Sequence, residues 1–128
     1  MTSVSPGVTG LAQVALSVKD LDAAVAFYRD VLGLAFLFSA PPSLAFLQCG
    51  TTRVMLNGDP NAPAAAGGPI LYYAVSDILA AFDAITAKGA PVKEAPKAIA
   101  RVGSRDVWLG FTEDPDGHAV GLMSEVEG

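Results

Sequence analysis

The stretch VALSVKDLDAAVAFYRDVLGL, residues 14–34, predicts a strand followed by a helix. Val14–Val18 has the apolar and β-branched composition of a short strand, and Asp20 is a residue type that caps helix N-termini. The apolar residues that follow recur at helical spacing. Gly33 stands where a residue in the left-handed conformation would end the helix.

The same arrangement returns in LYYAVSDILAAFDAI, residues 71–85. Val18 and Asp20 correspond to Val75 and Asp77 with one offset, 57 positions (75 − 18), which indicates an internal repeat. Short strand-like runs follow each helix. They are Leu34–Phe38, Leu44–Gln48 and Arg53–Leu56 in the first half, and Val92–Lys93, Val107–Phe111 and Ala119–Met123 in the second. This repeated pattern predicts an α+β fold of two tandem βαβββ modules that form a concave, partly closed mixed sheet.

We expect one domain over residues 1–128. The first module spans about residues 10–57 and the second about residues 70–124. Between them, residues 58–69 are rich in Pro, Gly and Ala without periodicity, which is typical of a linker.

The composition excludes several classes of protein. Hydrophobic residues make up 52% of the chain and charged residues 16%, but charges interrupt every apolar stretch, so no membrane span is expected. The net charge of −5 argues against a nucleic-acid partner. The single cysteine, Cys49, cannot form an internal disulfide, and the N-terminus lacks the pattern of a signal peptide, so a cytoplasmic location is expected. A chain so poor in charge favours a buried subunit interface or an apolar binding cavity.

Three motifs in this order resemble the vicinal oxygen chelate superfamily, which contains glyoxalases, bleomycin-resistance proteins and extradiol dioxygenases. They are Val14–Val18 with Asp20-Leu21, the run AFYRDVLGL at residues 26–34, and Asp114-Pro115-Asp116-Gly117. The resemblance implies paired βαβββ modules, a large concave sheet surface and a homodimer.

The resemblance also implies where a catalytic member would hold a divalent metal. The four positions fall on Gln13, Met55, Ile70 and Gly121. Only Gln13 offers an oxygen ligand, whereas hard divalent cations prefer carboxylates. We therefore expect neither a metal nor another cofactor.

Strand alternation from these positions predicts the lining of the concave face. Each anchor shares its face with the residue two positions away: Arg53 with Met55, Tyr72 with Ile70, and Met123 with Gly121. The alternative interpretation of each aromatic or methionine side chain is ordinary packing in the core. Arg53 is the one candidate anion anchor on this face, or else a solvated charge at a strand end. The register of Trp108 is unanchored, but its indole would add an aromatic wall. Phe38 and Phe46 are further candidates for the lining.

Other reactive side chains have simpler interpretations. His118 follows the Gly117 turn and is expected to be a solvated surface residue. The carboxylates of the turn are explained by turn chemistry, and Glu125 and Glu127 are expected in a frayed tail. Cys49 is expected to be an inert thiol.

The predicted function is binding and sequestration of an apolar or amphipathic small molecule, as the resemblance to bleomycin-resistance proteins implies. The alternative is a metal-dependent glyoxalase-type lyase or dioxygenase with displaced ligands, in which His118, Glu125 or a partner subunit would join Gln13. A third possibility is a structural or regulatory subunit whose open faces bury protein. The sequence leaves open whether the two modules close within one chain or across a dimer.

Overall fold

The structure is a computed structural model that describes residues 5–61 and 69–128. It contains two four-stranded sheets, ordered β1-β4-β3-β2 and β5-β8-β7-β6. In each sheet the first and last strands of the module pair in parallel, and the other neighbours are antiparallel. The first module contains β1 (Gln13–Ser17), α1 (Leu21–Ala26), η1 (Phe27–Val31), β2 (Ala35–Ala40), β3 (Leu44–Cys49) and β4 (Thr52–Asn57). The second contains β5 (Leu71–Ala74), α2 (Ile78–Ala87), β6 (Glu94–Val102), β7 (Arg105–Glu113) and β8 (Ala119–Glu127). The predicted α+β fold of two βαβββ modules is confirmed.

Both helices begin directly after the predicted aspartate caps. The side chain of Asp20 accepts a hydrogen bond from the backbone N of Ala23, and Asp77 does the same for Ala80, each at 3.1 Å. These caps satisfy backbone donors that have no partner within the helix. Gly33 has a φ of +80°, the conformation expected of a residue that ends a helix.

The first helix changes geometry halfway along. After α1 the chain continues as a single widened turn, η1, in which the backbone N of Leu32 donates to the carbonyl of Phe27 at 3.0 Å. This bond spans five residues, as in a π-helix. Both Phe27 and Tyr28 are buried in this turn.

The second module differs from the sequence prediction at two strands. β6 begins at Glu94 rather than at Val92, and β8 continues to Glu127, where a frayed tail was expected. β6 and β7 form a long hairpin, and Glu127 bonds to its turn through the Ser104 hydroxyl at 2.7 Å. Nearly every residue of β6 is exposed, so this strand lacks the apolar alternation that sequence patterns detect. The predicted linker at residues 58–69 lies mostly outside the described residues.

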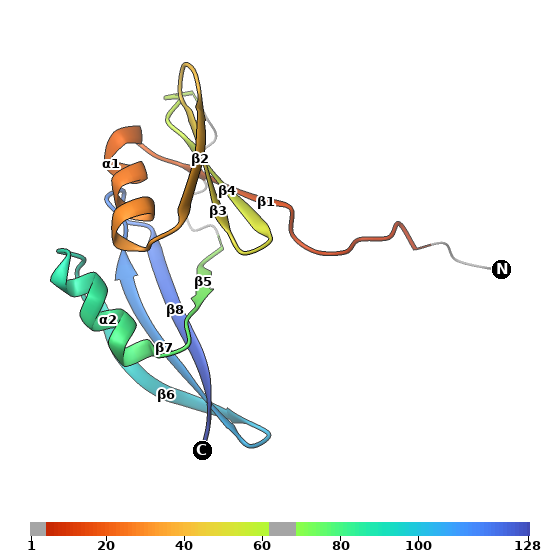
Figure 1. The fold of residues 1–128 in the computed structure, drawn as a ribbon, viewed down its shortest axis with the longest axis vertical. Helices are drawn as coiled ribbons and strands as arrows, with labels where there is room; N and C mark the ends of the chain where they lie inside the picture. The colour runs from red at the N-terminus through yellow and green to blue at the C-terminus, as the bar shows by residue number, and fades with distance from the viewer. Residues whose placement is uncertain (1–4, 62–68) are drawn as a thin grey trace.

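The two helices cover the same side of the molecule (Figure 1). The covered faces of the sheets carry the buried side chains of alternate strand positions, and residues of both modules join in one hydrophobic core. Its largest members from the strands include Leu47, Val54, Leu56, Val120 and Leu122. None of the helices in the described ranges is long and apolar enough to cross a membrane.

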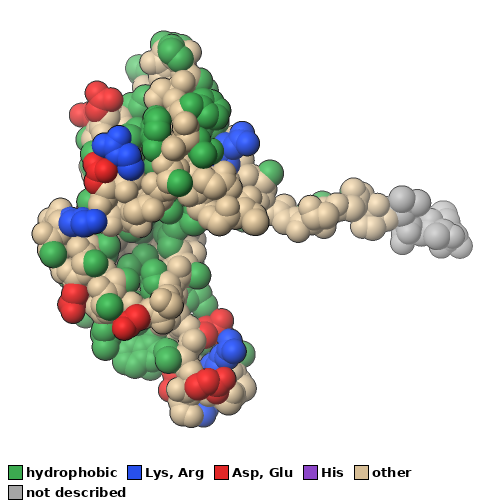
Figure 2. All heavy atoms as spheres, in the orientation of Figure 1, with side chains coloured by type: hydrophobic (Ala, Val, Ile, Leu, Met, Phe, Trp, Pro, Cys, Tyr) green, Lys and Arg blue, Asp and Glu red, His purple; other side chains and the backbone are tan. Residues whose placement is uncertain are grey.

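The opposite face of each sheet is open. The sheets are not closed on one another, and the main packing contacts of the strands are within each sheet or with the helix of the same module. Figure 2 shows hydrophobic side chains over the strands of the first sheet, while charged side chains gather near α1 and at the β6–β7 hairpin. Large apolar side chains on or beside the open faces are therefore about half exposed, including Phe38, Ile70 and Tyr72.

Candidate ligand-binding faces

The open face of the first sheet carries an apolar row across four strands. The strand registers place Ala15 opposite Met55, Met55 opposite Phe46, and Phe46 opposite Phe38. The Phe38 and Phe46 rings are stacked, with centroids 4.6 Å apart and an interplanar angle of 25°. This geometry is favourable for aromatic pairs and leaves Phe38 49% exposed. The row is a flat aromatic surface next to a flexible thioether.

A polar row lies beside it on the same face. Arg53 is opposite Gln13 on β1 and Gln48 on β3. The guanidinium carbon of Arg53 lies 5.9 Å from the centroid of the Phe46 ring, within the range of a cation–π contact. Gln13 Nε2 donates to the sulfur of Met55 at 3.7 Å, and Gln48 Nε2 donates to the carbonyl of Gly50 at 2.8 Å. The predicted residues Gln13, Arg53 and Met55 are thus brought together.

The open face of the second sheet centres on Tyr72. This residue is opposite Gly121 on β8, and Gly121 is opposite Phe111 on β7. The Tyr72 and Phe111 rings meet edge to face, with centroids 5.6 Å apart. Met123 is opposite Leu109 and follows Gly121 on the same face by strand alternation. Tyr72 and Met123 therefore share this face, as predicted.

Trp108 does not lie on this face, contrary to the sequence prediction. It is opposite Ser124, which alternation places on the side away from Gly121 and Met123. Its indole packs against the core on the helix-covered side. The neighbouring Gly110 confirms this orientation, because a Cβ there would meet the Phe82 ring of α2 at 2.7 Å. No residue in the sequence determines the register of this strand, and the face predicted for Trp108 was wrong.

Phe111 is the lining residue that the sequence analysis did not single out. It lay inside a predicted strand, but without a register its face could not be assigned. The signal that would have found it is the pairing of β7 with β8, which places Phe111 opposite Gly121.

The residues at the four metal positions of the resemblance do not fit a divalent cation. Gln13 and Met55 are in contact, but the Gln13 amide nitrogen is engaged with the Met55 sulfur. Ile70 and Gly121 offer no side-chain donor. A Cβ built on Gly121 would lie 2.7 Å from the Tyr72 ring, so the aromatic ring fills the space that a longer side chain would need. No carboxylate occupies any of the four positions.

A different group of metal-binding residue types lies in the turn before β8. Among the described residues, Asp114, Asp116 and His118 offer ligand atoms within 4.8 Å of one another. Asp114 is buried, and its carboxylate accepts from the backbone N of Asp116, the backbone N of His118, the His118 ring and the Tyr28 hydroxyl. Asp116 accepts from the backbone N of Lys19 at 2.8 Å. Both carboxylates are therefore engaged in hydrogen bonds. Those from Tyr28 and Lys19 join the turn to the first module.

The displaced ligand set of the alternative function is not assembled either. His118 precedes β8 and Glu125 lies near its far end, seven residues later. At the usual rise of a strand, this separation is about 23 Å. These two residues of one chain cannot share a metal ion with Gln13.

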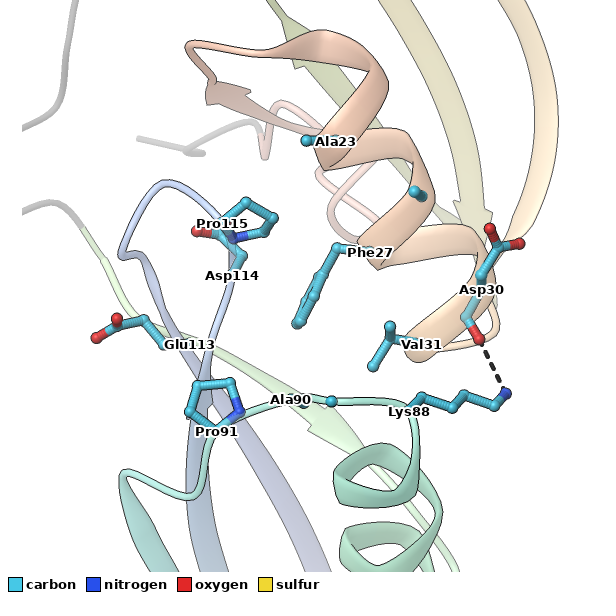
Figure 3. A pocket seen from close by; sticks show the side chains of 12 residues that line it. Ala23, Phe27, Asp30, Val31, Lys88, Ala90, Pro91, Glu113, Asp114 and Pro115 are labelled. Atoms are coloured by element: carbon cyan, nitrogen blue, oxygen red, sulfur yellow. Dashed lines mark hydrogen bonds between the residues drawn. The ribbon is translucent and has the colours of Figure 1, made fainter.

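A groove lies where the two modules meet on the helix side, away from the open faces. Its volume is about 420 Å³. Figure 3 shows Phe27 and Val31 pointing from the first module toward Ala90 and Pro91 of the second. Lys88 Nζ donates to the carbonyl of Asp30 at 2.9 Å across this junction.

The charged groups of the groove already have partners. The Asp30 carboxylate pairs with Arg29 at 2.8 Å, and Glu113 lies 3.5 Å from Lys93. The groove therefore lies at the junction of the two modules, and the charged side chains that line it are engaged with other protein groups.

Cys49 is a free, partly buried thiol at the end of β3. Burial raises its pKa above the ordinary value. A thiol whose pKa is raised is mostly protonated near neutral pH and is a poor nucleophile.

Two βαβββ modules, each with one helix-covered and one open sheet face, define the class of fold. The family model described as Glyoxalase/Bleomycin resistance protein/Dioxygenase superfamily matches residues 10–122, and the chain belongs to this superfamily. No curated protein matches the sequence.

Solved structures with the same fold differ in their described activities. A lactoylglutathione lyase from Agrobacterium tumefaciens is 24% identical with a TM-score of 0.75, over 92% of this chain and 95% of that one. TnmS3, an antibiotic binding protein from Streptomyces sp. CB03234, is 20% identical with a TM-score of 0.73, over 94% of this chain and 98% of that one. At these identities the similarity establishes the fold alone.

Proposed function

We propose that this protein binds an apolar or amphipathic small molecule on its open sheet faces and sequesters it without chemical change. The observation that carries the proposal is the position of Tyr72 over Gly121. Where a catalytic relative would place a metal ligand, this chain places an aromatic ring. The fold is shared with TnmS3, which is described as an antibiotic binding protein, and this supports a binding function.

The chemistry of the faces supports a ligand with flat apolar parts. Phe46 with Phe38, and Tyr72 with Phe111, form one aromatic pair on each sheet. Met55 and Met123 lie beside these pairs, and methionine adapts to irregular shapes. Arg53 and the Tyr72 hydroxyl add polar contacts that could orient a ligand.

We further propose that two chains pair so that their open faces cover one another. The support is the exposed apolar surface, since half-exposed Phe38, Ile70 and Tyr72 belong to faces that nothing covers in a single chain. Light scattering coupled to gel filtration should give twice the chain mass of 13.1 kDa. A mass of one chain over the whole concentration range would contradict the pairing.

The binding proposal is tested with N-phenyl-1-naphthylamine, a neutral aromatic probe whose fluorescence rises in apolar surroundings. We expect saturable binding to the purified, chelator-treated protein. Tyr72→Ala and Met55→Ala should each weaken it at least about threefold, because each removes apolar contact area.

Leu79→Ala is the matched control. Leu79 is an exposed apolar residue of α2, on the covered side of the second sheet. Its replacement should leave the affinity unchanged. Equal effects of all three substitutions, or no saturable binding, would contradict the proposed site. Metal analysis that finds about one tightly held divalent ion per chain would contradict sequestration without a metal.

A further inference from the structure

We infer that the ligand of the first open face is a flat aromatic carboxylate, held by Arg53 beside the stacked Phe38 and Phe46 rings. The inference rests on the proposed function and names the class of molecule that this face would bind.

Arg53 is an arginine with an uncompensated charge. In the part of the chain that the structure describes, Arg29, Arg101 and Arg105 each pair with a carboxylate, whereas Arg53 has no ion pair. The chain carries 13 acidic residues against 8 basic ones, so partners for an arginine are plentiful. An unpaired guanidinium on a face of this kind has its charge available to a ligand.

The surroundings of Arg53 exclude acidic groups. On the open face of the first sheet, the described strand positions hold no aspartate or glutamate. The neighbours across the strands are Gln13 and Gln48, both neutral. A cationic ligand would meet only the positive charge of Arg53 and would be repelled.

The aromatic surface beside Arg53 favours a flat ligand. Phe38 is half exposed, and its ring extends a stack that already contains Phe46. Arg53 lies over the same Phe46 ring at 5.9 Å. A ligand ring that packs on the phenylalanines would therefore place a carboxylate substituent within reach of the guanidinium.

The guanidinium also explains why a neutral ligand would bind less well. A planar guanidinium can donate two parallel hydrogen bonds to a carboxylate, which a neutral amide cannot match. An uncharged ligand that covered Arg53 would remove water from the charge without replacing it.

The test compares 2-naphthoate with 2-naphthamide, two probes of nearly the same shape that differ in charge. Calorimetric titrations would use the full chain and the variants Arg53→Gln and Arg53→Lys. Arg105→Gln is the control, because Arg105 lies on the β6–β7 hairpin and pairs with Glu127. Unfolding midpoints of all variants would confirm that each is folded.

We expect the wild type to bind 2-naphthoate at least about tenfold more tightly than 2-naphthamide. Arg53→Gln should abolish that preference, Arg53→Lys should retain part of it, and Arg105→Gln should retain all of it. Binding of both probes with equal affinity, unchanged in Arg53→Gln, would overturn this inference and leave the proposed binding function intact. Failure of both probes to bind would overturn the inference, whereas the binding function is overturned only if N-phenyl-1-naphthylamine also fails to bind.

Discussion

The hydroxyl of Tyr28 donates a 2.6 Å hydrogen bond to the Asp114 carboxylate, joining the two modules through a buried contact. Tyr28 lies in η1 of the first module, and Asp114 lies in the turn between β7 and β8 of the second. The same carboxylate oxygen accepts from the His118 ring at 2.7 Å. The relative position of the two open faces therefore depends on this contact, together with the shared core.

Tyr28→Phe should destabilise the protein. The substitution removes a donor from a buried carboxylate, at a cost of about 1–3 kcal/mol in the free energy of unfolding. Urea unfolding followed by tryptophan fluorescence measures it, since Trp108 packs against the core.

Tyr73→Phe is the matched control. The Tyr73 hydroxyl is buried and has no hydrogen-bond partner among the described residues. Its removal should leave the free energy of unfolding within about 0.5 kcal/mol or raise it, because an unpaired buried hydroxyl is unfavourable. Equal losses in the two variants would contradict the role given to the Tyr28 bond.

Stability should fall when the pH rises above the ordinary tyrosine pKa of 10.0. Burial, together with the Asp114 carboxylate, raises the pKa of Tyr28 above that value, and burial raises the pKa of Tyr73. Below pH 10.0 both tyrosines are protonated in the folded and in the unfolded chain, so their contribution to the free energy of unfolding is fully present. Above it the unfolded chain ionises while the folded chain does not, so stability is lost.

The measurement is the urea midpoint at several pH values between about 9 and 11. The wild type should lose stability more steeply than the Tyr28→Phe/Tyr73→Phe double variant. Parallel curves for the two proteins would show that neither tyrosine is responsible.

Gly121→Ala should be destabilising because of Tyr72. The new Cβ would lie 2.7 Å from the Tyr72 ring, and this overlap forces the ring to move at a cost of about 1–3 kcal/mol. The same substitution in a Tyr72→Ala background should cost much less. The double-mutant cycle from urea unfolding measures this coupling. An equal cost in both backgrounds would mean that the ring does not occupy the space above Gly121.

Removal of divalent metal should change nothing. The four positions that the family resemblance assigns to a metal carry Gln13, Met55, Ile70 and Gly121, which provide no carboxylate. Dialysis against a chelator is expected to leave the thermal midpoint and the affinity for N-phenyl-1-naphthylamine unchanged. Recovery of a lost affinity on adding back Mg²⁺, Mn²⁺ or Zn²⁺ would contradict the claim that these residues do not hold a divalent cation.

The sequence predicted the repeat well because its signals are local. Asp20, Asp77 and Gly33 act through neighbours a few residues away, and each has the predicted role. Arg53 was placed on the same face as Met55 by alternation along β4, whereas the position of Gln13 on that face was implied by the family resemblance.

Features that depend on the register between distant strands could not be predicted from local sequence signals. Trp108 lies on the covered face because of how β7 pairs with β8, and a shift of one residue would reverse its face. Asp114 is buried and accepts a hydrogen bond from Tyr28, 86 positions earlier. β6 was placed too early because its exposed residues carry no apolar period.

The central claim is that a small molecule binds on the open faces beside Met55 and Met123. Methyl-labelled methionine gives separate NMR signals for Met55 and Met123, and the variants Met55→Leu and Met123→Leu assign them. On titration of the chelator-treated protein with N-phenyl-1-naphthylamine, we predict saturable shifts of the Met55 and Met123 methyls with a common dissociation constant. Binding of the probe that leaves both the Met55 and Met123 methyl signals unchanged would contradict the account.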